Sequence, residues 1–318
     1  MIKNLKEQEQ KFVSRDFPLN LLVEVGAYCN LNCIMCCNDS LTRKKGYMDM
    51  KLYRKIIDEV AEVSPGTRIW LDFVGEPLLA RYKLYFMIDY AKKKGLTNVN
   101  LNTNGILLDD EMADMLLDSG IDFLSTDVDG FSKEVYEKIR CGGDRDVLYN
   151  NLLNFAEKWK KREGKKPYFE IKVIEMEENK HEVQQIVDYW LDKGVGVGVR
   201  VLGNWAGNLK TVKHDINQER IACGLAIGQL GVTWDGTATV CGDDCDATLA
   251  CGDLNKESVQ EVWKRKQSMI KLHMEHRFDE LPKLCQQCTS WALAGSEEHY
   301  DPTGKKYDRS YEFDSPMV

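Results

Sequence analysis

The feature that most constrains the fold of this chain is a repeated alternation of short apolar runs with amphipathic stretches, which starts at Leu21. Each apolar run has the length of a buried strand, and each amphipathic stretch has the periodicity of a helix. Strands are predicted at 21–25, 68–73, 98–102, 123–127, 169–174 and 198–202, and helices at 52–63, 82–94, 111–119, in a longer region ending near 162, and at 180–193. This order predicts an α/β fold in which βα units build a parallel sheet.

Three cysteines follow the first predicted strand at Cys-x3-Cys-x2-Cys spacing, namely Cys29, Cys33 and Cys36. A loop that leaves a buried strand is a common place for chemistry in α/β folds. Three thiolates can bind one soft metal centre, whereas a closed zinc or iron–sulfur site needs four ligands. The missing ligand predicts an open coordination position where a molecule binds and reacts. Buried thiols or an incomplete zinc knuckle are the alternative.

This loop resembles the signature loop of the radical S-adenosylmethionine superfamily. In that family three cysteines hold a [4Fe–4S] cluster whose remaining iron chelates S-adenosylmethionine, and the reduced cluster cleaves it to a 5′-deoxyadenosyl radical. The resemblance implies a partial (β/α)6 barrel for the repeated region and a one-electron reductant such as flavodoxin or ferredoxin. It also places Met35 beside the adenine.

Polar residues follow the next three predicted strands. Val74-Gly75-Glu76-Pro77 is similar to the family's Gly-Gly-Glu-Pro segment, with Val74 replacing the first glycine. The resemblance implies that Gly75, Glu76 and Pro77 contact the methionyl amino group, to which a carboxylate is complementary. Further along lie Asn102, Asn104, Ser125 and Asp127. These side chains suit hydrogen bonds to a ribose or a substrate hydroxyl, although each stretch alone also reads as an ordinary turn.

Two charged residues interrupt the later strands. Lys172 lies in the fifth predicted strand and Arg200 in the sixth. A charge in an apolar strand points either into the lumen or toward the solvent end, and the sequence favours neither. In the lumen, Arg200 would form bidentate contacts with a substrate hydroxyl pair or carboxylate.

A second set of cysteines lies near the C-terminus. An Asp235-Gly236 turn between apolar runs predicts a hairpin that brings Cys223 close to Cys241, and a helix at 257–275 leads to Cys285-Gln286-Gln287-Cys288. Four thiolates supply every ligand of a closed metal site, and both a zinc ion and an iron–sulfur cluster are compatible with them. The arrangement resembles the twitch domain, a shortened SPASM domain, which implies one auxiliary [4Fe–4S] cluster held by Cys223, Cys241, Cys285 and Cys288.

The remaining cysteines have two interpretations. Cys37, Cys141, Cys245 and Cys251 are either buried or incidental thiols, or one of them donates a hydrogen atom to a substrate radical. Cys245 and Cys251 are the candidate donors, because they lie between the auxiliary ligands and radical epimerases use a thiol in this way. Gly252 makes Cys251 the preferred one.

Composition limits the partners. Lysine and arginine number 43 against 51 acidic residues, a net charge of −8, so nothing favours a nucleic-acid partner. No window approaches the ~18 apolar residues of a membrane span, and the polar start is not a secretory signal. We therefore predict a cytoplasmic protein. Eleven cysteines then favour metal ligation or catalysis over disulfides.

The predicted organisation is a radical barrel at 1–207, followed at 208–318 by a linker, a twitch domain and a C-terminal tail. The resemblance implies hydrogen abstraction from a carbinol carbon of a small polar substrate, such as an aminoglycoside-type sugar or cyclitol. Dehydrogenation and epimerisation remain open as outcomes. A peptide-modifying enzyme, either an epimerase, a maturase or a sulfatase-maturing type, is the first alternative, and a non-catalytic metal-binding module is the second.

Overall fold

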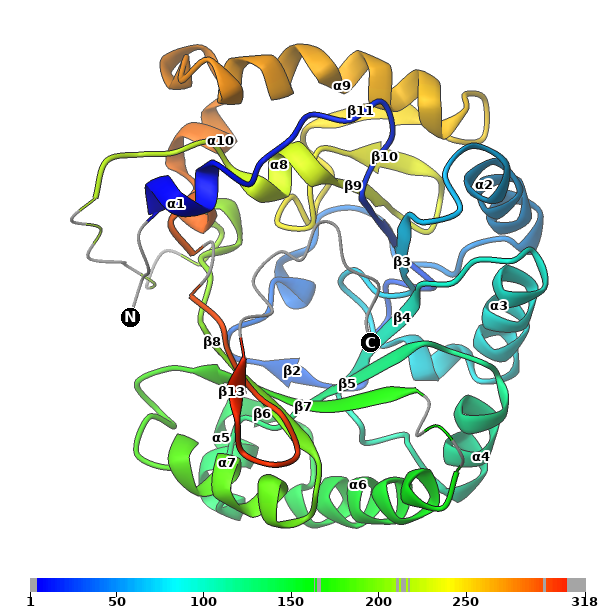
Figure 1. The fold of residues 1–318 in the computed structure, drawn as a ribbon, viewed down its shortest axis with the longest axis vertical. Coiled ribbons are helices and arrows are strands. Elements are labelled where there is room, and N and C mark those ends of the chain that lie inside the picture. The colour runs from blue at the N-terminus through cyan, green and yellow to red at the C-terminus, as the bar shows by residue number, and fades with distance from the viewer. Residues whose placement is uncertain are drawn as a thin grey trace.

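One curved sheet organises the computed structural model, which describes residues 5–162, 164, 167–209, 212, 216, 218–293 and 296–307 (Figure 1). Its strands are β1 (Asn20–Val23), β3 (Arg68–Trp70), β4 (Val99–Thr103), β5 (Phe123–Asp127), β7 (Tyr168–Glu175), β8 (Gly196–Val201), β9 (Gln229–Val232), β10 (Thr237–Thr239), β11 (Ala250–Asp253), β12 (Glu298–Tyr300) and β13 (Lys306–Tyr307). Their order across the sheet is β11-β10-β9-β1-β3-β4-β5-β7-β8-β12-β13. A separate two-stranded ladder joins β2 (Asn32–Cys33) to β6 (Arg140–Cys141).

Helices pack along the outer face of this sheet (Figure 1). The α-helices are α1 (Leu5–Glu9), α2 (Met50–Val63), α3 (Tyr82–Lys93), α4 (Asp110–Asp118), α5 (Lys133–Ile139), α6 (Arg145–Lys160), α7 (Val183–Asp192), α8 (Gly224–Gly228), α9 (Val259–Met274) and α10 (Lys283–Gln287). Short 3-10 turns are η1 (Asn38–Ser40), η2 (Pro77–Ala80), η4 (Trp205–Gly207), η5 (Phe278–Glu280) and η6 (Ser290–Leu293).

The predicted partial barrel is confirmed. Strands β1, β3, β4, β5, β7 and β8 are parallel neighbours in chain order, and helices connect them. Side-chain caps begin several of these helices; Asp109, for example, accepts a hydrogen bond from Met112 N at 2.8 Å. The barrel does not close on itself, because β9 pairs with β1 at one edge and β12 pairs with β8 at the other.

One predicted helical region is divided in two. The long helix expected to end near Arg162 consists of α5 and α6, and β6 separates them. Helix α5 ends at Ile139, and Gly142, whose φ of +88° favours glycine, lies in the turn between β6 and α6. The break allows Cys33 to pair with Arg140 in the β2–β6 ladder.

The C-terminal region continues the same sheet. The predicted hairpin forms between β9 and β10, where Gly236 N donates to Thr233 O at 2.9 Å, and α9 covers it. Residues 210, 211, 213–215 and 217 of the expected linker, and the tail from 308, lie outside the described residues. Within the described ranges, no helix has both the length and the apolar character of a membrane span.

Candidate active site

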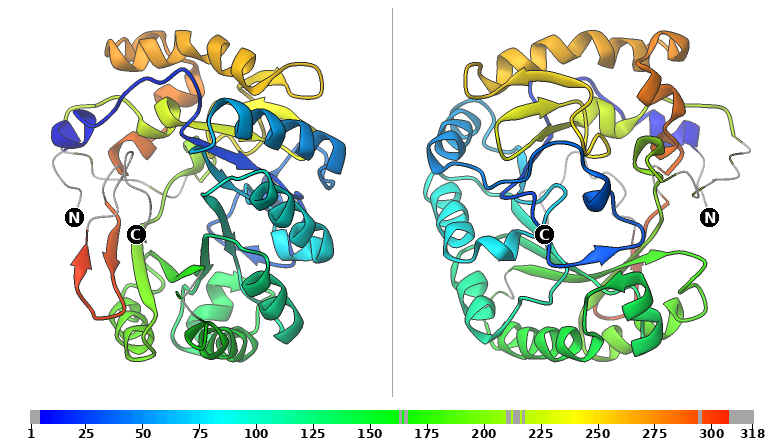
Figure 2. Two further views of the ribbon diagram at one scale, coloured as in Figure 1. Left: turned by 45° about the vertical axis from the view of Figure 1, so that its right-hand side comes forward. Right: turned by 180° about the vertical axis from the view of Figure 1, so that it is seen from behind.

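A cavity of about 450 Å³ occupies the lumen of the partial barrel beside the cysteine loop. The loop after β1 crosses the middle of the ring formed by strands and helices (Figure 2, right). Most of the residues predicted for the site line this cavity: Cys29, Cys33, Met35, Cys36, Gly75, Glu76, Asn102, Asn104, Asp127, Lys172 and Arg200. Pro77 begins η2, and Ser125 is fully buried in β5; neither contributes to the cavity wall.

The cysteine loop is held by backbone contacts and by one buried amide. Ile34 N donates to Ile139 O at 3.0 Å, next to the β2–β6 ladder. The side-chain amide of Asn38 donates to Ala27 O at 2.9 Å and to Val74 O at 3.1 Å. The loop is thereby attached both to α5 and to the segment after β3.

Arg140 is a site residue that the sequence analysis missed. Its guanidinium is buried and donates to Asp129 (Nε to Oδ2, 2.6 Å), pairs with Asp127 at 3.2 Å, and lies 3.7 Å from the Cys33 sulfur. Burial raises the pKa of Cys33 to about 12, and the charge of Arg140 opposes this rise. A metal centre that binds thiolates would be favoured by this cation, because it offsets the negative charge that the ligands bring.

The Gly75-Glu76 segment has a geometry that only glycine permits. A Cβ on Gly75 would lie 2.0 Å from Gly26 O, and Glu76 N donates to Tyr28 O at 2.8 Å. The Glu76 carboxylate accepts from Leu78 N (2.9 Å), Thr103 Oγ1 (2.7 Å) and Asn104 N (2.8 Å). Burial raises its pKa to about 7. A buried acceptor fixed in this way on the cavity wall suits an amino group.

The polar residues at the ends of β4 and β5 form two hydrogen-bonded groups. Asn104 donates to Asn30 Oδ1 at 2.9 Å, and its side-chain nitrogen lies 3.9 Å from the Cys29 sulfur. Asn102 donates to Asp127 Oδ2 at 3.1 Å and accepts from Ser125 Oγ at 2.6 Å. Because Asp127 lines the cavity and its Oδ1 has no hydrogen-bond partner among the described residues, this oxygen is an acceptor for a ligand hydroxyl.

Lys172 and Arg200 both lie in the lumen, which answers the question that the sequence left open. Lys172 Nζ is 5.2 Å from the ring centroid of Trp70. Asp72 also lines the cavity, and burial raises its pKa to about 7, partly offset by the charge of Lys172. The lumen therefore offers both cations and carboxylates to a substrate.

The C-terminal hairpin adds two further residues that the sequence analysis missed, Glu297 and His299. His299 lies 2.5 Å from Glu170 (Nδ1 to Oε1) and 3.2 Å from Glu297 (Nε2 to Oε2). Gly198 makes room for this pair, since a Cβ there would lie within 2.9 Å of both Glu170 and His299. No motif in the sequence marks this contact, because it depends on pairing of β12 with β8 across about a hundred residues.

The second thiol set lies in an apolar environment. Cys241 and Cys285 pack with Ala226, Val240, Met269 and Leu281, and Cys223 lies against the same cluster. Burial raises the pKa values of Cys223 and Cys285 to about 12, and the charge of Cys288 adds to both rises. Four thiols that influence one another fit a fully ligated centre, and the Asp243 carboxyl also raises the pKa of Cys223, Cys241 and Cys288. Among the described residues, no three His, Cys, Asp or Glu side chains are arranged to hold a single metal ion. A four-iron cluster is larger than a single ion, so its ligands lie farther apart.

Neither candidate hydrogen donor lies on the wall of the cavity. Cys245 is 1% exposed and packs with Cys37 and Val74. Cys251 lies in β11, where its thiol donates to Ala238 O at 3.5 Å. Neither thiol lines the lumen, and this placement opposes direct hydrogen donation to a molecule bound there. Cys37 is buried, as its preferred interpretation requires.

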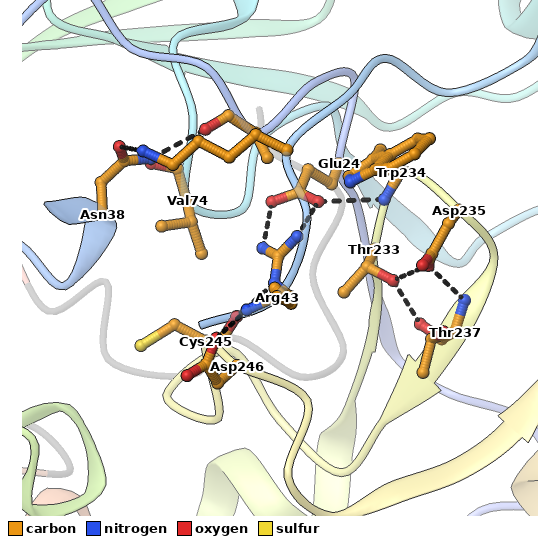
Figure 3. A network of polar contacts seen from close by, with 12 residues as sticks. Glu24, Asn38, Arg43, Val74, Thr233, Trp234, Asp235, Thr237, Cys245 and Asp246 are labelled. Atoms are coloured by element: carbon orange, nitrogen blue, oxygen red, sulfur yellow. Dashed lines mark hydrogen bonds and ion pairs between the residues drawn. The ribbon is translucent and has the colours of Figure 1, made fainter. Parts of the chain in front are cut away.

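A buried ion pair connects the cysteine loop to the second region (Figure 3). Arg43 donates to Glu24 through both terminal nitrogens, at 2.8 and 2.6 Å, and Glu24 also accepts from Trp234 N at 2.9 Å. Arg43 Nε donates to Cys245 O at 2.7 Å, and Asp246 accepts from Arg43 N at 3.1 Å. The two thiol regions are thus joined by polar contacts as well as by the sheet.

A partial parallel barrel with a three-cysteine loop beside its lumen is the arrangement that the sequence predicted for the radical S-adenosylmethionine superfamily. Sequence comparison agrees. The family model "Radical SAM superfamily" matches residues 23–189, just over half of the chain, and that of SPASM, an iron–sulfur cluster-binding domain, matches residues 223–289. The chain belongs to the radical S-adenosylmethionine superfamily, and its cofactors are S-adenosylmethionine and iron–sulfur clusters.

Individual relatives are more distant. The chain is 28% identical over 178 residues to the tungsten-containing aldehyde ferredoxin oxidoreductase cofactor-modifying protein of Pyrococcus furiosus, covering 55% of this chain and 49% of that protein. It is 32% identical over 125 residues to a probable GTP 3′,8-cyclase of Methanococcus maripaludis, covering 39% of this chain and 41% of that protein. The matches therefore span about half or less of each relative.

Solved structures share the fold. BtrN in complex with AdoMet and 2-DOIA superposes with a TM-score of 0.63 at 19% identity, over 87% of this chain and 94% of that one. Streptococcus suis SuiB bound to the precursor peptide SuiA gives a TM-score of 0.66 at 12% identity, over 91% and 73%. At these identities the likeness concerns architecture.

Proposed function

We propose that this radical S-adenosylmethionine enzyme removes a hydrogen atom from a carbinol carbon of a small polar substrate, such as an aminoglycoside-type sugar or cyclitol. When bound, the first cluster and S-adenosylmethionine supply the 5′-deoxyadenosyl radical that abstracts this atom. In this proposal Cys29, Cys33 and Cys36 hold that cluster, and Glu76 accepts from the methionyl amino group. A flavodoxin or ferredoxin supplies the electron.

The observation that carries the proposal is the composition of the lumen. Its volume of about 450 Å³ includes the space beside Cys29, Cys33 and Cys36, so the part left for a substrate suits a small molecule. Lys172 and Arg200 stand on its wall with Asp72 and Glu297, so hydroxyl and amino groups of one substrate find partners of both signs. The wall is therefore complementary to a polar reactant rather than to an apolar one.

Dehydrogenation is the outcome that the thiol positions favour. Epimerisation needs a hydrogen donor within reach of the substrate radical, and neither Cys245 nor Cys251 lines the lumen. In dehydrogenation the radical loses one electron to the auxiliary cluster and one proton, and the carbinol becomes a carbonyl. The proposed ligands of that cluster are Cys223, Cys241, Cys285 and Cys288.

The test is transfer of deuterium from substrate to 5′-deoxyadenosine. Reconstituted enzyme is incubated with dithionite, S-adenosylmethionine and a panel of amino sugars and aminocyclitols deuterated at carbinol carbons. We expect one member to give deuterated 5′-deoxyadenosine and a product lighter by two hydrogens. Arg200→Met should abolish this transfer while leaving substrate-independent cleavage of S-adenosylmethionine unchanged. Transfer only from peptide Cα–D positions would instead support a peptide-modifying enzyme.

A further inference from the structure

Lys266 is a buried lysine in the middle of α9, on the helix face that packs against the second thiol set. It is 2% exposed, its ammonium donates to Gln229 O, and its Nζ lies 4.5 Å from the Trp263 ring centroid. No carboxylate pairs with Lys266 in the described part of the chain. Because an isolated buried charge is strongly unfavourable, the position calls for a compensating anion.

The ionisable groups around Lys266 are thiols, which become anions when they bind a metal centre. Cys241, Cys223 and Cys285 of the proposed cluster site act on it, as does Cys251. Met269, one turn further along the same face of α9, packs in the apolar cluster with Cys241 and Cys285. Burial lowers the pKa of Lys266 to about 8, so the side chain is still mainly an ammonium ion at pH 7.

Arg220 is the other cation near this site, but water screens it more. Its Nη2 donates to Cys285 O at 2.8 Å, and its guanidinium lies over Phe278, 4.8 Å from the ring centroid. Both cations act on the Cys285 thiol, Arg220 more than Lys266, and Arg220 also acts on Cys288. Lys266 differs from the half-buried Arg220 in being almost fully enclosed, so water screens its charge less.

We propose that Lys266 raises the reduction potential of the auxiliary cluster and so makes it a better acceptor of the substrate electron. A four-iron cluster on four thiolates is an anion, and one-electron reduction adds another negative charge. A nearby fixed cation stabilises the reduced form more than the oxidised form. The inference depends on Cys223, Cys241, Cys285 and Cys288 being the ligands of the auxiliary cluster. It concerns the reduction potential of that cluster and uses none of the geometry on which the substrate proposal is based.

The test measures the auxiliary cluster alone. In the full-length Cys29→Ala, Cys33→Ala, Cys36→Ala protein only the second cluster remains, and its midpoint potential is read by electron paramagnetic resonance during titration with dithionite. Lys266→Met keeps the length and apolar packing of the side chain but removes the charge. We expect the equilibrium constant for reduction of the auxiliary cluster to fall at least tenfold in this variant. For a one-electron reduction, a tenfold fall lowers the midpoint potential by about 59 mV.

Matched variants separate charge from packing. Lys264→Met removes an exposed lysine from the same helix and should leave the potential unchanged, and Lys266→Arg should keep it close to that of the parent. A Lys266→Met potential equal to that of the Lys264→Met control would overturn the proposal. So would loss of the cluster from both Lys266→Met and Lys266→Gln proteins that keep their helical spectrum, since Lys266 would then be a structural residue. No substrate enters the measurement, so its result is independent of the proposed reaction.

Discussion

The two thiol regions use the same donor atoms in opposite surroundings. Cys29, Cys33 and Cys36 are half-buried and face a polar cavity lined by charged side chains. The second set packs among apolar side chains beside Lys266 and contributes nothing to the cavity wall described above. The difference teaches that ligand number and environment act together. Three thiols beside a polar lumen suit a centre that binds and reacts, and four in an apolar shell suit one that exchanges electrons.

The largest effect should separate the two regions completely. Replacing Cys33 with Ala removes a proposed ligand of the open centre, so formation of 5′-deoxyadenosine should fall below detection. Wild type should contain about eight irons, and the protein lacking all three first-loop cysteines about half that number. Iron and sulfide analysis with chromatography of the nucleoside provides the measurement. Full cleavage activity in Cys33→Ala would remove the basis of the comparison, as would zinc in the second site after anaerobic purification.

A second prediction concerns the buried cation of the first region. Arg140→Met leaves Asp129 and Asp127 buried without their partner, so unfolding free energy should fall by about 3–5 kcal/mol. Denaturant unfolding of the apo protein measures this. The control is Arg277→Met, whose side chain is exposed and pairs with the exposed carboxylates of Glu275 and Glu280; it should cost about 1 kcal/mol or less. Equal losses in the two variants would show that Arg140 has no special role.

The third prediction tests the connection between the regions. Glu24→Gln keeps the shape of the side chain but weakens its contacts to Arg43 and to Trp234 N, so stability should fall by about 2 kcal/mol. Because Arg43 also contacts the segment at Cys245, the variant should expose that thiol to alkylation faster than wild type. Mass spectrometry after timed labelling reads this out. Unchanged labelling of Cys245 would mean that the two regions are held together by the sheet alone.

The smallest expected effect is a pH dependence confined to the first region. Burial raises the pKa of Glu76 to about 7, compared with about 4.3 for an unfolded glutamate. Its ionised form therefore destabilises the apo fold, and stability gained from its protonation should appear as pH falls from about 7 toward 4.3. Binding of S-adenosylmethionine should change in the opposite direction and weaken about fivefold to tenfold from pH 8 to pH 6, because the protonated carboxyl loses an acceptor.

Anaerobic calorimetric titration across this pH range measures the binding. Glu76→Gln should bind weakly at every pH and show a flat profile, whereas Asp235→Asn, distant from the cavity, should follow wild type. A steep pH profile that persists in Glu76→Gln would assign the effect to another group, with Asp72 as the next candidate because burial raises its pKa to about 7 as well.

The sequence by itself determined the barrel and the family. Strand-length apolar runs and helix caps are local signals, so the parallel order from β1 to β8 and the Asp-Gly hairpin followed from residues close together in the chain. The Cys-x3-Cys-x2-Cys loop is equally local, and it identified the family that the comparison with known proteins then confirmed. The assignment of individual ligands, and the boundary at 207, stay predictions.

Only the tertiary structure decided how the lumen is charged and which thiols reach it. Lys172 and Arg200 face inward because successive side chains of a strand point to opposite faces of the sheet. A shift of the strand register by one residue would turn them outward. His299 joins the site through pairing of β12 with β8, and Arg140 reaches Cys33 through the β2–β6 ladder. Cys245 and Cys251, close to the auxiliary ligands in sequence, do not line the lumen. Contacts of this kind join segments far apart in the chain, and no local pattern encodes them.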